Sequence, residues 1–195
     1  MKHLFFLSIL IASCMSSPNT TSPLSPDTKN SGNTILYSFP QQGKGNWRVR
    51  NDVVMGGRSN SQLKMTTEGN AHFTGSVSLE NNGGFCSIYH SMEGEPPILK
   101  DKTTFFLRVK GDGKDYSFRV RKPGSRYSYA FKFPTKEGED WETIAIPFHA
   151  MEATFRGWSV DVPNYAGEAI VEMRILIGNK RAEDFDLFID AVEVN

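Results

Sequence analysis

The residues of this chain that could perform nucleophilic chemistry are a cysteine and a histidine close to it in sequence. Cys86 and His90 are four positions apart, and a thiolate beside an imidazole is the arrangement of a cysteine nucleophile. On a strand this spacing puts both side chains on one face but about 13 Å apart along it, which is too far for a hydrogen bond. We therefore expect Cys86 to be buried and inert, and we predict no catalytic residues.

Metal chemistry would need His, Cys or carboxylate side chains at the spacing of a ligand set. His72, His90 and His149 form no His-x-His or His-x-x-x-His pair, so the sequence predicts no zinc site. The acidic residues do not follow the spacing of an EF-hand loop. We expect a protein without a metal ion or other cofactor.

Two glycine pairs, each preceded by Asn or Asp, lie in the stretches from Asn51 to Ser59 and from Asn81 to Phe85. A glycine pair in an ordered loop indicates positive φ angles or close backbone approach. Neither stretch has the Lys-Ser/Thr and helix context of a phosphate-binding loop. Two interpretations stay open: turns that hold strand ends together, and a binding rim on a rigid scaffold. The polar contacts of such a rim would be Asn51, Asp52, Arg58, Asn81 and Asn82.

Cations alternate with apolar residues in three consecutive segments of the chain. If Phe105, Leu107 and Val109 and the apolar residues of 116–120 point inward, the alternating cations beside them point outward on neighbouring strands, and Lys132 joins them if the aromatic residues of the next strand are buried. The resulting candidate basic face consists of Arg108, Lys110, Arg119, Arg121 and Lys132. Such a face could bind an anion or an acidic partner. The alternative is an ordinary soluble face balanced by Glu142 and Glu172.

The elements that must position these residues are β-strands. From Ile35 onward, apolar residues recur at every second position, and helical periodicity is nearly absent. Such runs occupy 71–79, 105–109, 116–120, 127–133, 171–177 and 185–194. About ten or eleven short strands with one apolar face predict two antiparallel sheets packed on each other, a number typical of a jelly roll. Helical turns are expected only at Asp101–Thr104 and Pro147–Phe155.

Length and charge limit the classes of function. The 195 residues suffice for one domain with appendages, and 38% hydrophobic residues can form a core. Lys and Arg together number 22, as do Asp and Glu, so overall charge gives no reason to expect a nucleic-acid partner. No apolar run reaches the roughly eighteen residues of a membrane-spanning helix.

The N-terminal residues have the form of an export signal. A polar start is followed by an apolar run from Leu4 to Ile11, and Ile11-Ala12-Ser13-Cys14 resembles a bacterial lipobox. We therefore predict that residues 1–13 are a lipoprotein signal peptide. Cys14 would be lipidated and would anchor the chain at the periplasmic side of a membrane in the cell envelope. The alternatives are an ordinary signal peptide with an incidental cysteine and a buried N-terminal strand.

Residues 14–33 are predicted to be the lipidated cysteine and a flexible tether, because Ser, Thr, Pro and Asn dominate this stretch. The globular domain is predicted to occupy residues 34–195. With Cys14 acylated, Cys86 has no partner for an intramolecular disulfide.

Motifs along this domain resemble those of the complex I intermediate-associated protein 30 family, in order and at plausible spacing from about Ile35 to Val194. The first block is Trp47 with Asn51-Asp52-x-Val54-Met55-Gly56-Gly57-x-Ser59, and the second is Phe73-x-Gly75 with Leu79-Glu80-Asn81-Asn82-Gly83-Gly84-Phe85. Later blocks are Val109-Lys110-Gly111-Asp112-Gly113-Lys114-x-Tyr116, Trp141, Ile146-Pro147-Phe148 and Phe185-x-Leu187-x-Ile189.

The resemblance implies a galactose-binding-domain-like jelly roll, the fold of many carbohydrate-binding modules. It also implies a chaperone role in the assembly of mitochondrial respiratory complex I. The fold makes Asp190, on the last strand, a weak calcium candidate. An exported lipoprotein faces the periplasm, whereas the catalytic arm of bacterial complex I faces the cytoplasm, so the complex I role transfers less readily than the fold.

Three classes of function follow from these observations. The leading hypothesis is a non-enzymatic, lipid-anchored binding or assembly module that holds an unidentified protein partner. The alternative is a carbohydrate-binding module at the cell envelope. An enzyme is disfavoured, because the sequence contains no catalytic constellation at workable spacing.

Overall fold

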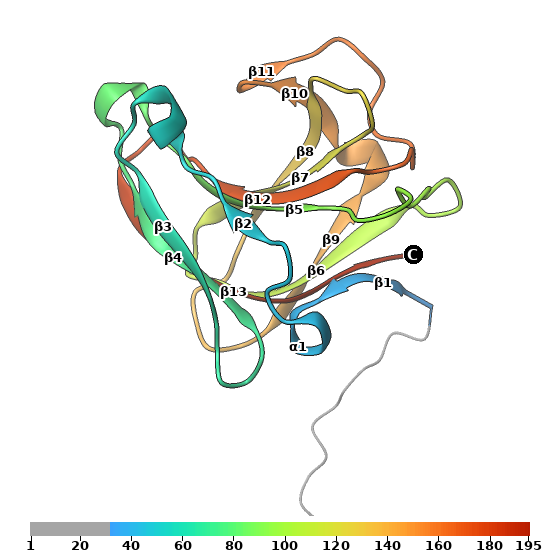
Figure 1. The fold of residues 1–195 in the computed structure, drawn as a ribbon, viewed down its shortest axis with the longest axis horizontal. Helices are drawn as coiled ribbons and strands as arrows, with labels where there is room; N and C mark the ends of the chain where they lie inside the picture. The colour runs from blue at the N-terminus through green and yellow to red at the C-terminus, as the bar shows by residue number, and fades with distance from the viewer. Residues whose placement is uncertain (1–31) are drawn as a thin grey trace, which may run out of the picture. The chain divides into compact units, whose positions relative to one another are not determined.

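Alternating side chains build the strands of this chain, because a strand directs successive residues to opposite faces. Phe105, Leu107 and Val109 are fully buried, whereas Arg108 between them is exposed. The computed structural model describes residues 32–195, and the strands of this part form two antiparallel sheets that pack face to face (Figure 1). The predicted all-β sandwich of two sheets is confirmed.

The first sheet has six strands in the order β3-β4-β13-β6-β9, and β1 pairs with the end of β13. Their bounds are β1 Thr34–Ser38, β3 Asn60–Met65, β4 Ala71–Val77, β6 Thr104–Lys110, β9 Glu142–Pro147 and β13 Glu183–Val194. β13 forms the centre of this sheet, because it pairs with β4 on one side and β6 on the other.

The second sheet has seven strands in the order β11-β10-β8-β7-β12-β5-β2. Their bounds are β2 Arg48–Val49, β5 Cys86–Ser91, β7 Asp115–Arg121, β8 Ser128–Pro134, β10 Glu152–Phe155, β11 Trp158–Ser159 and β12 Glu172–Ile177. At the centre, Ile175 of β12 lies opposite Phe118 of β7 and Ile88 of β5, and all three are fully buried. These residues form the inner face of the second sheet.

Large rings join the two sheets across the core. Phe105 of β6 packs against Phe118 of β7 with ring centroids 5.3 Å apart. Burying a Phe side chain stabilises a fold by about 2–3 kcal/mol, and an edge-to-face ring pair adds about 1 kcal/mol. Further rings, including Phe73, Tyr116 and Phe133, are buried in the same core.

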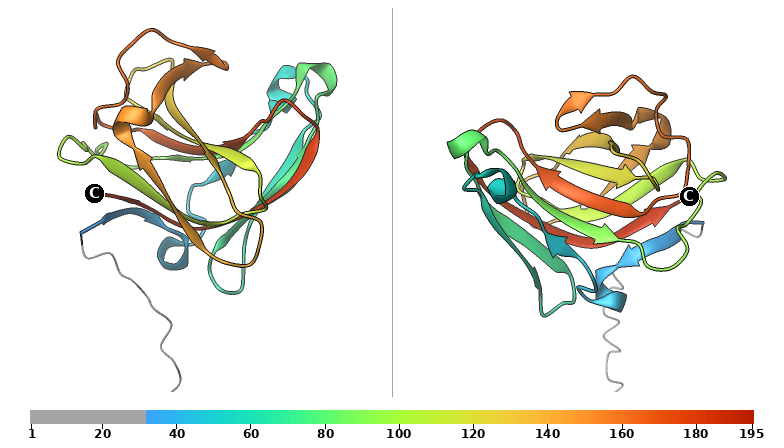
Figure 2. Two further views of the ribbon diagram at one scale, coloured as in Figure 1. Left: turned by 180° about the vertical axis from the view of Figure 1, so that it is seen from behind. Right: turned by 45° about the horizontal axis from the view of Figure 1, so that its top comes forward.

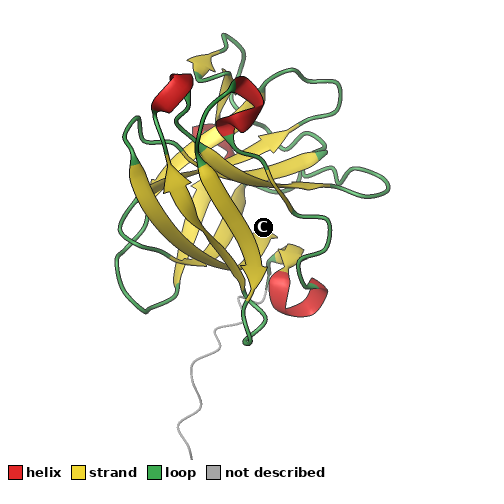
Figure 3. Cartoon of the chain, turned by 60° about the vertical axis from the view of Figure 1, so that its left-hand side comes forward, coloured by secondary structure: helices red, strands yellow, loops and turns green. Residues whose placement is uncertain are grey.

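The helices are single turns in the connections between strands (Figure 3). Their bounds are α1 Phe39–Gln42, η1 Asp52–Met55, η2 Glu80–Asn82 and η3 Phe148–Ala150. η3 lies within the segment Pro147–Phe155, where a helical turn was expected. The expectation is wrong for Asp101–Thr104, which leads directly into β6. It is also wrong in admitting no other helical turns, because α1, η1 and η2 lie outside both segments. Within residues 32–195, no helix has the length and apolar character needed to cross a membrane.

The seven-stranded sheet curls so that its outer face is concave (Figures 1 and 2). β10 and β11 rise over one side of this face, and the loops that contain η1 and η2 stand at the other side (Figure 1). The predicted signal peptide, Cys14 and nearly all of the predicted tether lie outside the described residues.

Candidate functional site

The two glycine-containing loops lie side by side at one end of the sandwich, teal and green in Figure 1. One follows β2 and spans residues 51–59, and the other follows β4 and spans residues 79–85; we call them the paired loops. Asn81 in the second loop donates from Nδ2 to the carbonyl oxygen of Gly56 in the first, over 3.1 Å. Segments far apart in the sequence thus form one structural unit.

Asp52 joins the paired loops through its buried carboxylate. Oδ2 accepts hydrogen bonds from the backbone amides of Gly84 and Phe85 at 2.6 and 3.3 Å. The amide of Ser59 donates to Oδ1 at 3.1 Å, and the Ser59 hydroxyl donates to Oδ2. Burial alone would raise the pKa of Asp52, but these hydrogen bonds outweigh it and hold the pKa below its ordinary value. The carboxylate is therefore charged at neutral pH, and its acceptor positions are occupied by the protein itself.

The glycines let the backbone approach this carboxylate. A Cβ atom on Gly57 would lie 2.4 Å from Cγ of Asp52, and one on Gly83 would lie 2.6 Å from its Oδ2. Gly84 has a φ of 137°, which favours glycine. These contacts favour the turn interpretation for the glycines themselves.

The polar residues predicted to form a binding rim fall into two groups. Asn51 and Asp52 are buried, and Oδ1 of Asn51 accepts a hydrogen bond from the Ser61 hydroxyl over 2.7 Å. These two residues support the loops from inside, so their assignment to an exposed rim is corrected. The remaining predicted rim residues are exposed: Arg58, Asn81 and Asn82.

The exposed surface of the paired loops, which we call the rim, consists of Val53, Arg58, Leu79, Glu80, Asn81 and Asn82. Val53 is 56% exposed and Leu79 is 45% exposed. Nη1 of Arg58 lies 3.0 Å from Oε2 of Glu80. The rim thus places apolar side chains beside charged and amide groups, a composition suited to contact with another protein.

The predicted basic face does not exist as one surface. β6 belongs to the six-stranded sheet, whereas β7 and β8 belong to the seven-stranded sheet. The prediction is therefore wrong, because the outward directions from the two sheets are opposite. The two groups of cations are Arg108 and Lys110 on one side, and Arg119, Arg121 and Lys132 on the other.

On the six-stranded side, both cations have acidic partners. Nε of Arg108 lies 3.3 Å from Oδ2 of Asp190, and Nζ of Lys110 lies 2.8 Å from Oε2 of Glu139. Oδ1 of Asp190 also accepts a hydrogen bond from Nδ2 of Asn70 over 2.9 Å. The oxygens of this weak calcium candidate are thus engaged by nitrogen donors, and residues 32–195 contain no group of three or more His, Cys, Asp or Glu that could hold a metal ion.

A groove of about 500 Å³ crosses the concave face of the seven-stranded sheet. It is hollow because outward positions on its floor carry small side chains, including Ser117 of β7, Ala130 of β8 and Thr154 of β10. The charged residues that line it are Asp115, Arg119, Lys132, Glu152 and Lys180. Of these, Lys132 and Asp115 form an ion pair of 3.0 Å.

A row of side chains continues from the groove across β7, β12, β5 and β2. Arg119 lies opposite Arg174, Arg174 lies opposite Tyr89, and Tyr89 lies opposite Arg48. The guanidinium carbons of Arg50 and Arg174 lie 4.5 and 5.4 Å from the ring centroid of Tyr89. The name arginine row is used below for five residues: Arg48, Arg50, Tyr89, Arg119 and Arg174.

Glu172 of β12 balances part of this positive charge. Its buried carboxylate accepts hydrogen bonds from Nη2 of Arg174 at 2.8 Å and from Nη2 of Arg121 at 3.2 Å. Arg119 instead donates from Nε to the hydroxyl of Ser117 over 3.3 Å. Burial and then the charge of Arg174 lower the pKa of Arg119, although a guanidinium remains protonated in proteins.

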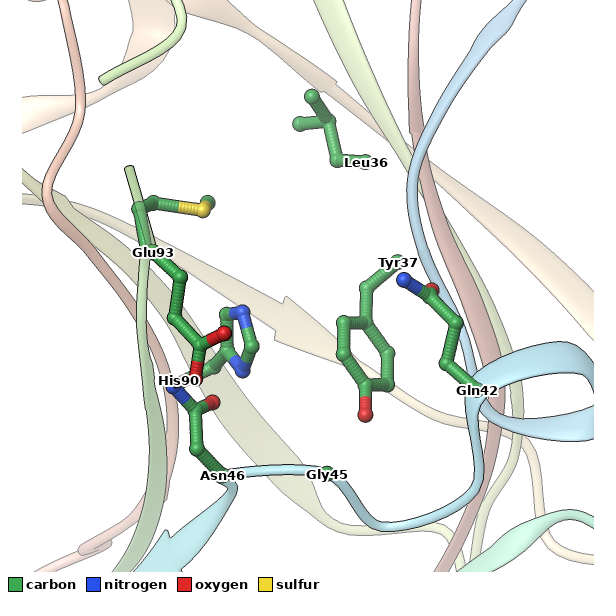
Figure 4. A pocket seen from close by; sticks show the side chains of 8 residues that line it. Leu36, Tyr37, Gln42, Gly45, Asn46, His90 and Glu93 are labelled. Carbon is green, nitrogen blue, oxygen red and sulfur yellow. Dashed lines mark hydrogen bonds between the residues drawn. The ribbon is translucent and has the colours of Figure 1, made fainter. Parts of the chain in front are cut away.

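A second hollow, of about 310 Å³, lies where β1, the segment after α1 and the end of β5 meet (Figure 4). Tyr37 stands across it from His90, Asn46 and Glu93 (Figure 4). Among the described residues, Oδ1 of Asn46 and Nδ1 of His90 are buried without a hydrogen-bond partner. Burial lowers the pKa of His90 more than the charge of Glu93 raises it, so the imidazole is neutral at neutral pH. This hollow suits water or a small polar molecule that completes these bonds.

The candidate nucleophile is part of the core. Cys86 is fully buried, and its Sγ lies 3.7 Å from the carbonyl oxygens of Asn60 and Ser76. Burial is the main cause that raises the pKa of Cys86 to about 11. The predicted burial of Cys86 is confirmed, and its raised pKa keeps the thiol protonated at neutral pH.

The predicted lipidation site, Cys14, lies outside the described residues, and its lipidation stays a prediction. The groove and the arginine row were not foreseen from the sequence as a site. Their residues come from β2, β5, β7, β8, β10 and β12, so only strand pairing brings them together.

Comparison with known families gives a match over most of the described domain. The family model described as complex I intermediate-associated protein 30 matches residues 37–189. A protein of Mus musculus named "Complex I intermediate-associated protein 30, mitochondrial" is 30% identical over 123 residues. This alignment covers 52% of the chain and 37% of the mouse protein, so the chain corresponds to well under two thirds of that relative.

Solved structures with a similar fold include carbohydrate-binding modules. The family 11 module of the cellulosomal cellulase Lic26A-Cel5E of Clostridium thermocellum has a TM-score of 0.59 at 14% identity, over 84% of this chain and 94% of that chain. A family 29 module has a TM-score of 0.51 at 6% identity, over 83% of each chain. The agarase AgWH50C has a TM-score of 0.59 at 10% identity, over 84% of this chain and 24% of the enzyme. These likenesses confirm the predicted galactose-binding-domain-like jelly roll.

Proposed function

Because the chain belongs to the complex I intermediate-associated protein 30 family, we propose that it is a non-enzymatic binding module that holds a protein partner while a larger complex assembles. The mouse relative is named for an intermediate of complex I, which makes subunits of respiratory complex I the first partners to test.

The rim is the observation that carries this proposal. It is built by the stretches 51–59 and 79–85, and the charged hydrogen bonds of Asp52 hold these two stretches together. A loop surface fixed in this way loses little conformational entropy when it binds, which favours affinity. The exposed Val53 and Leu79 supply apolar area, and the Arg58–Glu80 ion pair supplies polar groups beside it.

The chemistry of the buried groups supports a role in binding. A reactive cysteine needs a thiolate, and burial keeps the Cys86 thiol protonated. The Asp52 carboxylate is charged but surrounded by donors from its own loops, so it is poorly placed to accept a proton from a substrate.

The proposal includes an anchor at Cys14, with residues 14–33 as a tether that holds the domain near a membrane of the cell envelope. An exported domain would face away from the cytoplasmic arm of complex I. This arrangement favours a partner that is exposed on the periplasmic side.

Photo-crosslinking from the rim tests the protein-partner role. A photoreactive residue at Leu79 and one at Val53 should capture the same protein in the cells that produce this chain, because both side chains are exposed on the rim. Lys64, exposed on the outer face of β3, is the control position and should not capture it. Mass spectrometry of the product identifies the partner and shows whether it is a subunit of complex I.

A second variant links the crosslink to the rim surface. Leu79→Asp should lower the yield from position 53 several-fold, because it removes apolar area and places a charge in the interface. The same product from Lys64, or a yield from position 53 that Leu79→Asp leaves unchanged, would count against this function.

Carbohydrate binding is the second candidate, and the groove on the concave face favours it. Its volume of about 500 Å³ lies within the usual range of ligand sites, and its floor is open because Ala130 and Ser117 are small. Ala130→Trp places a large ring on this floor without entering the core, and it should abolish binding to polysaccharides in affinity gels. Unchanged retardation of Ala130→Trp would exclude the groove as the site.

A further inference from the structure

The arginine row contains two guanidinium groups that face each other across neighbouring strands. Arg119 of β7 lies directly opposite Arg174 of β12, and both side chains point to the concave face. Like charges at directly opposed positions of a sheet destabilise it. An anion between the two guanidinium groups would remove this repulsion.

The protein itself supplies only part of that negative charge. Glu172 binds Arg174 and Arg121, so its two oxygens are already shared. Among residues 32–195, Arg119 forms no salt bridge, and its guanidinium donates only to the Ser117 hydroxyl. Arg119 therefore retains donors that can bind an oxyanion of a ligand, and a guanidinium can bind a carboxylate through two parallel hydrogen bonds.

Tyr89 does not offer the usual platform for a neutral sugar ring. β12 and β2 flank β5 on its two sides, and the Tyr89 ring is approached by Arg174 of β12 and by Arg50, the residue that follows β2. The Tyr89 ring is thus in contact with two guanidinium groups. Charge, and not stacking on this ring, is what the row can offer a ligand.

The position of the groove favours a saccharide over a peptide. The groove lies on the face of the sheet, where the backbone groups of β7, β8 and β12 are already paired, so a peptide cannot join it as an extra strand. Arg119 and Arg174 offer only donors, and the nearby Glu172 oxygens are already bound by Arg174 and Arg121. Peptide N–H groups would therefore find few free acceptors beside this pair of arginines. The hydroxyl and carboxylate oxygens of a saccharide can accept hydrogen bonds from the guanidinium groups. Each hydroxyl can at the same time donate its own proton to water, so no donor of the ligand is left without a partner.

We propose that this groove binds an acidic saccharide, with the carboxylate of a uronic acid residue between Arg119 and Arg174. The proposal rests on the carbohydrate-binding candidate function of the groove and names the class of sugar. It is independent of a protein partner at the rim.

Calorimetric titration of the full chain with polyuronate oligosaccharides tests the proposal. The probes are short oligomers of galacturonate, of alginate and of hyaluronate; the matched probe is the methyl ester of the galacturonate oligomer, which keeps the ring and loses the charge. We expect at least one acidic oligomer to bind, and we expect Arg119→Gln and Arg174→Gln each to weaken it by about tenfold or more. Esterification should have a similar effect on a galacturonate ligand. Lys64→Gln, on the other sheet, should bind as the wild type does.

Thermal unfolding shows whether a variant binds less because it has lost a contact with the ligand or because it no longer folds. Arg119→Gln should unfold at or above the wild-type temperature, because it removes a like-charge contact, and Arg119→Lys should retain part of the affinity. A pattern in which Arg119→Gln binds normally, or in which acid and methyl ester bind equally, would overturn the proposal.

Two further results would also overturn it. Absence of binding by all three acidic oligomers would exclude a uronate ligand. An oligoglutamate peptide that binds more tightly than the oligomers, and loses this with Arg119→Gln, would identify an acidic protein segment as the occupant. Retardation by a neutral polysaccharide that Ala130→Trp abolishes, together with no binding of the acidic oligomers, would overturn this proposal and leave the carbohydrate-binding function of the groove intact. The crosslinks from Leu79 and Val53 are independent of both.

Discussion

The backbone amide of Gly84 lies 2.6 Å from Oδ2 of Asp52, a residue 32 positions earlier in the chain. This contact explains why the two glycine pairs occur together. One loop supplies a buried carboxylate and the other supplies amides that point at it. Gly57 and Gly83 have no Cβ where that carboxylate must fit. The motif is thus a device that fixes two loops against each other.

Asp52→Asn should lower the free energy of unfolding by about 3 kcal/mol at neutral pH. The side-chain amide of Asn keeps one acceptor oxygen, but its NH₂ group would point at backbone N–H groups that bind the carboxylate in the wild type. Two donors would then face each other without an acceptor. Urea unfolding followed by tryptophan fluorescence measures the change. Asp184→Asn, at an exposed position of β13, is the control and should stay within about 0.5 kcal/mol of wild type.

The same pair of proteins gives a pH test. Because the pKa of Asp52 is lowered in the folded state, the unfolded chain binds the proton first as the pH falls. The advantage of wild type over Asp52→Asn should be complete above the ordinary value of 3.8 and should shrink as the pH falls below it. An advantage that is lost already near neutral pH would contradict the assigned hydrogen bonds.

Gly57→Ala should destabilise the protein by about 2 kcal/mol or more, because the new Cβ would lie 2.4 Å from Cγ of Asp52. Asp52→Ala removes that Cγ, so the double variant should lose less than the sum of the single variants. Gly56→Ala is the control: its φ is 88° but nothing lies within 4 Å, so its cost should add to that of Asp52→Ala. Additive losses for Gly57→Ala as well would show that no close approach exists.

The side-chain pattern was sufficient to predict the faces of the strands. Phe105, Leu107 and Val109 occupy every second position and are buried, as are Tyr116, Phe118 and Val120. Period-two patterning reports which side of a strand is apolar, and it does so for each strand alone. The two-sheet sandwich follows from such faces, and it was predicted correctly.

The alternation of side chains does not show which strands pair with each other. The prediction of a single basic face was wrong for this reason. Gly111-Asp112-Gly113 has the composition of a hairpin turn, yet it carries the chain from the six-stranded to the seven-stranded sheet. Gly111 and Asp112 pair with Glu137, and Oδ2 of Asp112 accepts a hydrogen bond from the amide of Asp186. Glycine and aspartate favour tight turns, and such turns occur both in hairpins and in connections between two sheets. Their presence therefore does not tell the two kinds of connection apart.

The groove and the arginine row could not be predicted for a related reason. Arg119 and Arg174 are 55 positions apart (174 − 119) and meet only because β7 pairs with β12. The overall charge of the chain does not indicate the local excess of positive charge on the concave face, since Lys and Arg together equal Asp and Glu in number.

Cys14→Ala should move the protein from the membrane fraction to the soluble fraction, because a lipid on this residue is the predicted anchor. Intact-mass measurement should show the lipid on the wild type and not on the variant. Cys86→Ala is the matched control, and it should leave both fractionation and lipid mass unchanged, since Cys86 is buried in the core. An unlipidated Cys14→Ala protein that stays with the membrane would contradict the anchor.

His90→Phe should reduce the loss of stability in mild acid. His90 is buried beside Tyr37 and Trp47, and burial lowers its pKa although Glu93 opposes this effect. The unfolded chain therefore takes up the proton at a higher pH than the folded protein does, so stability is complete above the ordinary value of 6.5 and falls below it. Phe packs against the same rings but does not titrate, so the free energy of unfolding of wild type relative to His90→Phe should decrease between about pH 6.5 and pH 5. Parallel pH profiles for the two proteins in urea unfolding would mean that His90 is protonated equally in both states, and that the hollow around it is open to solvent.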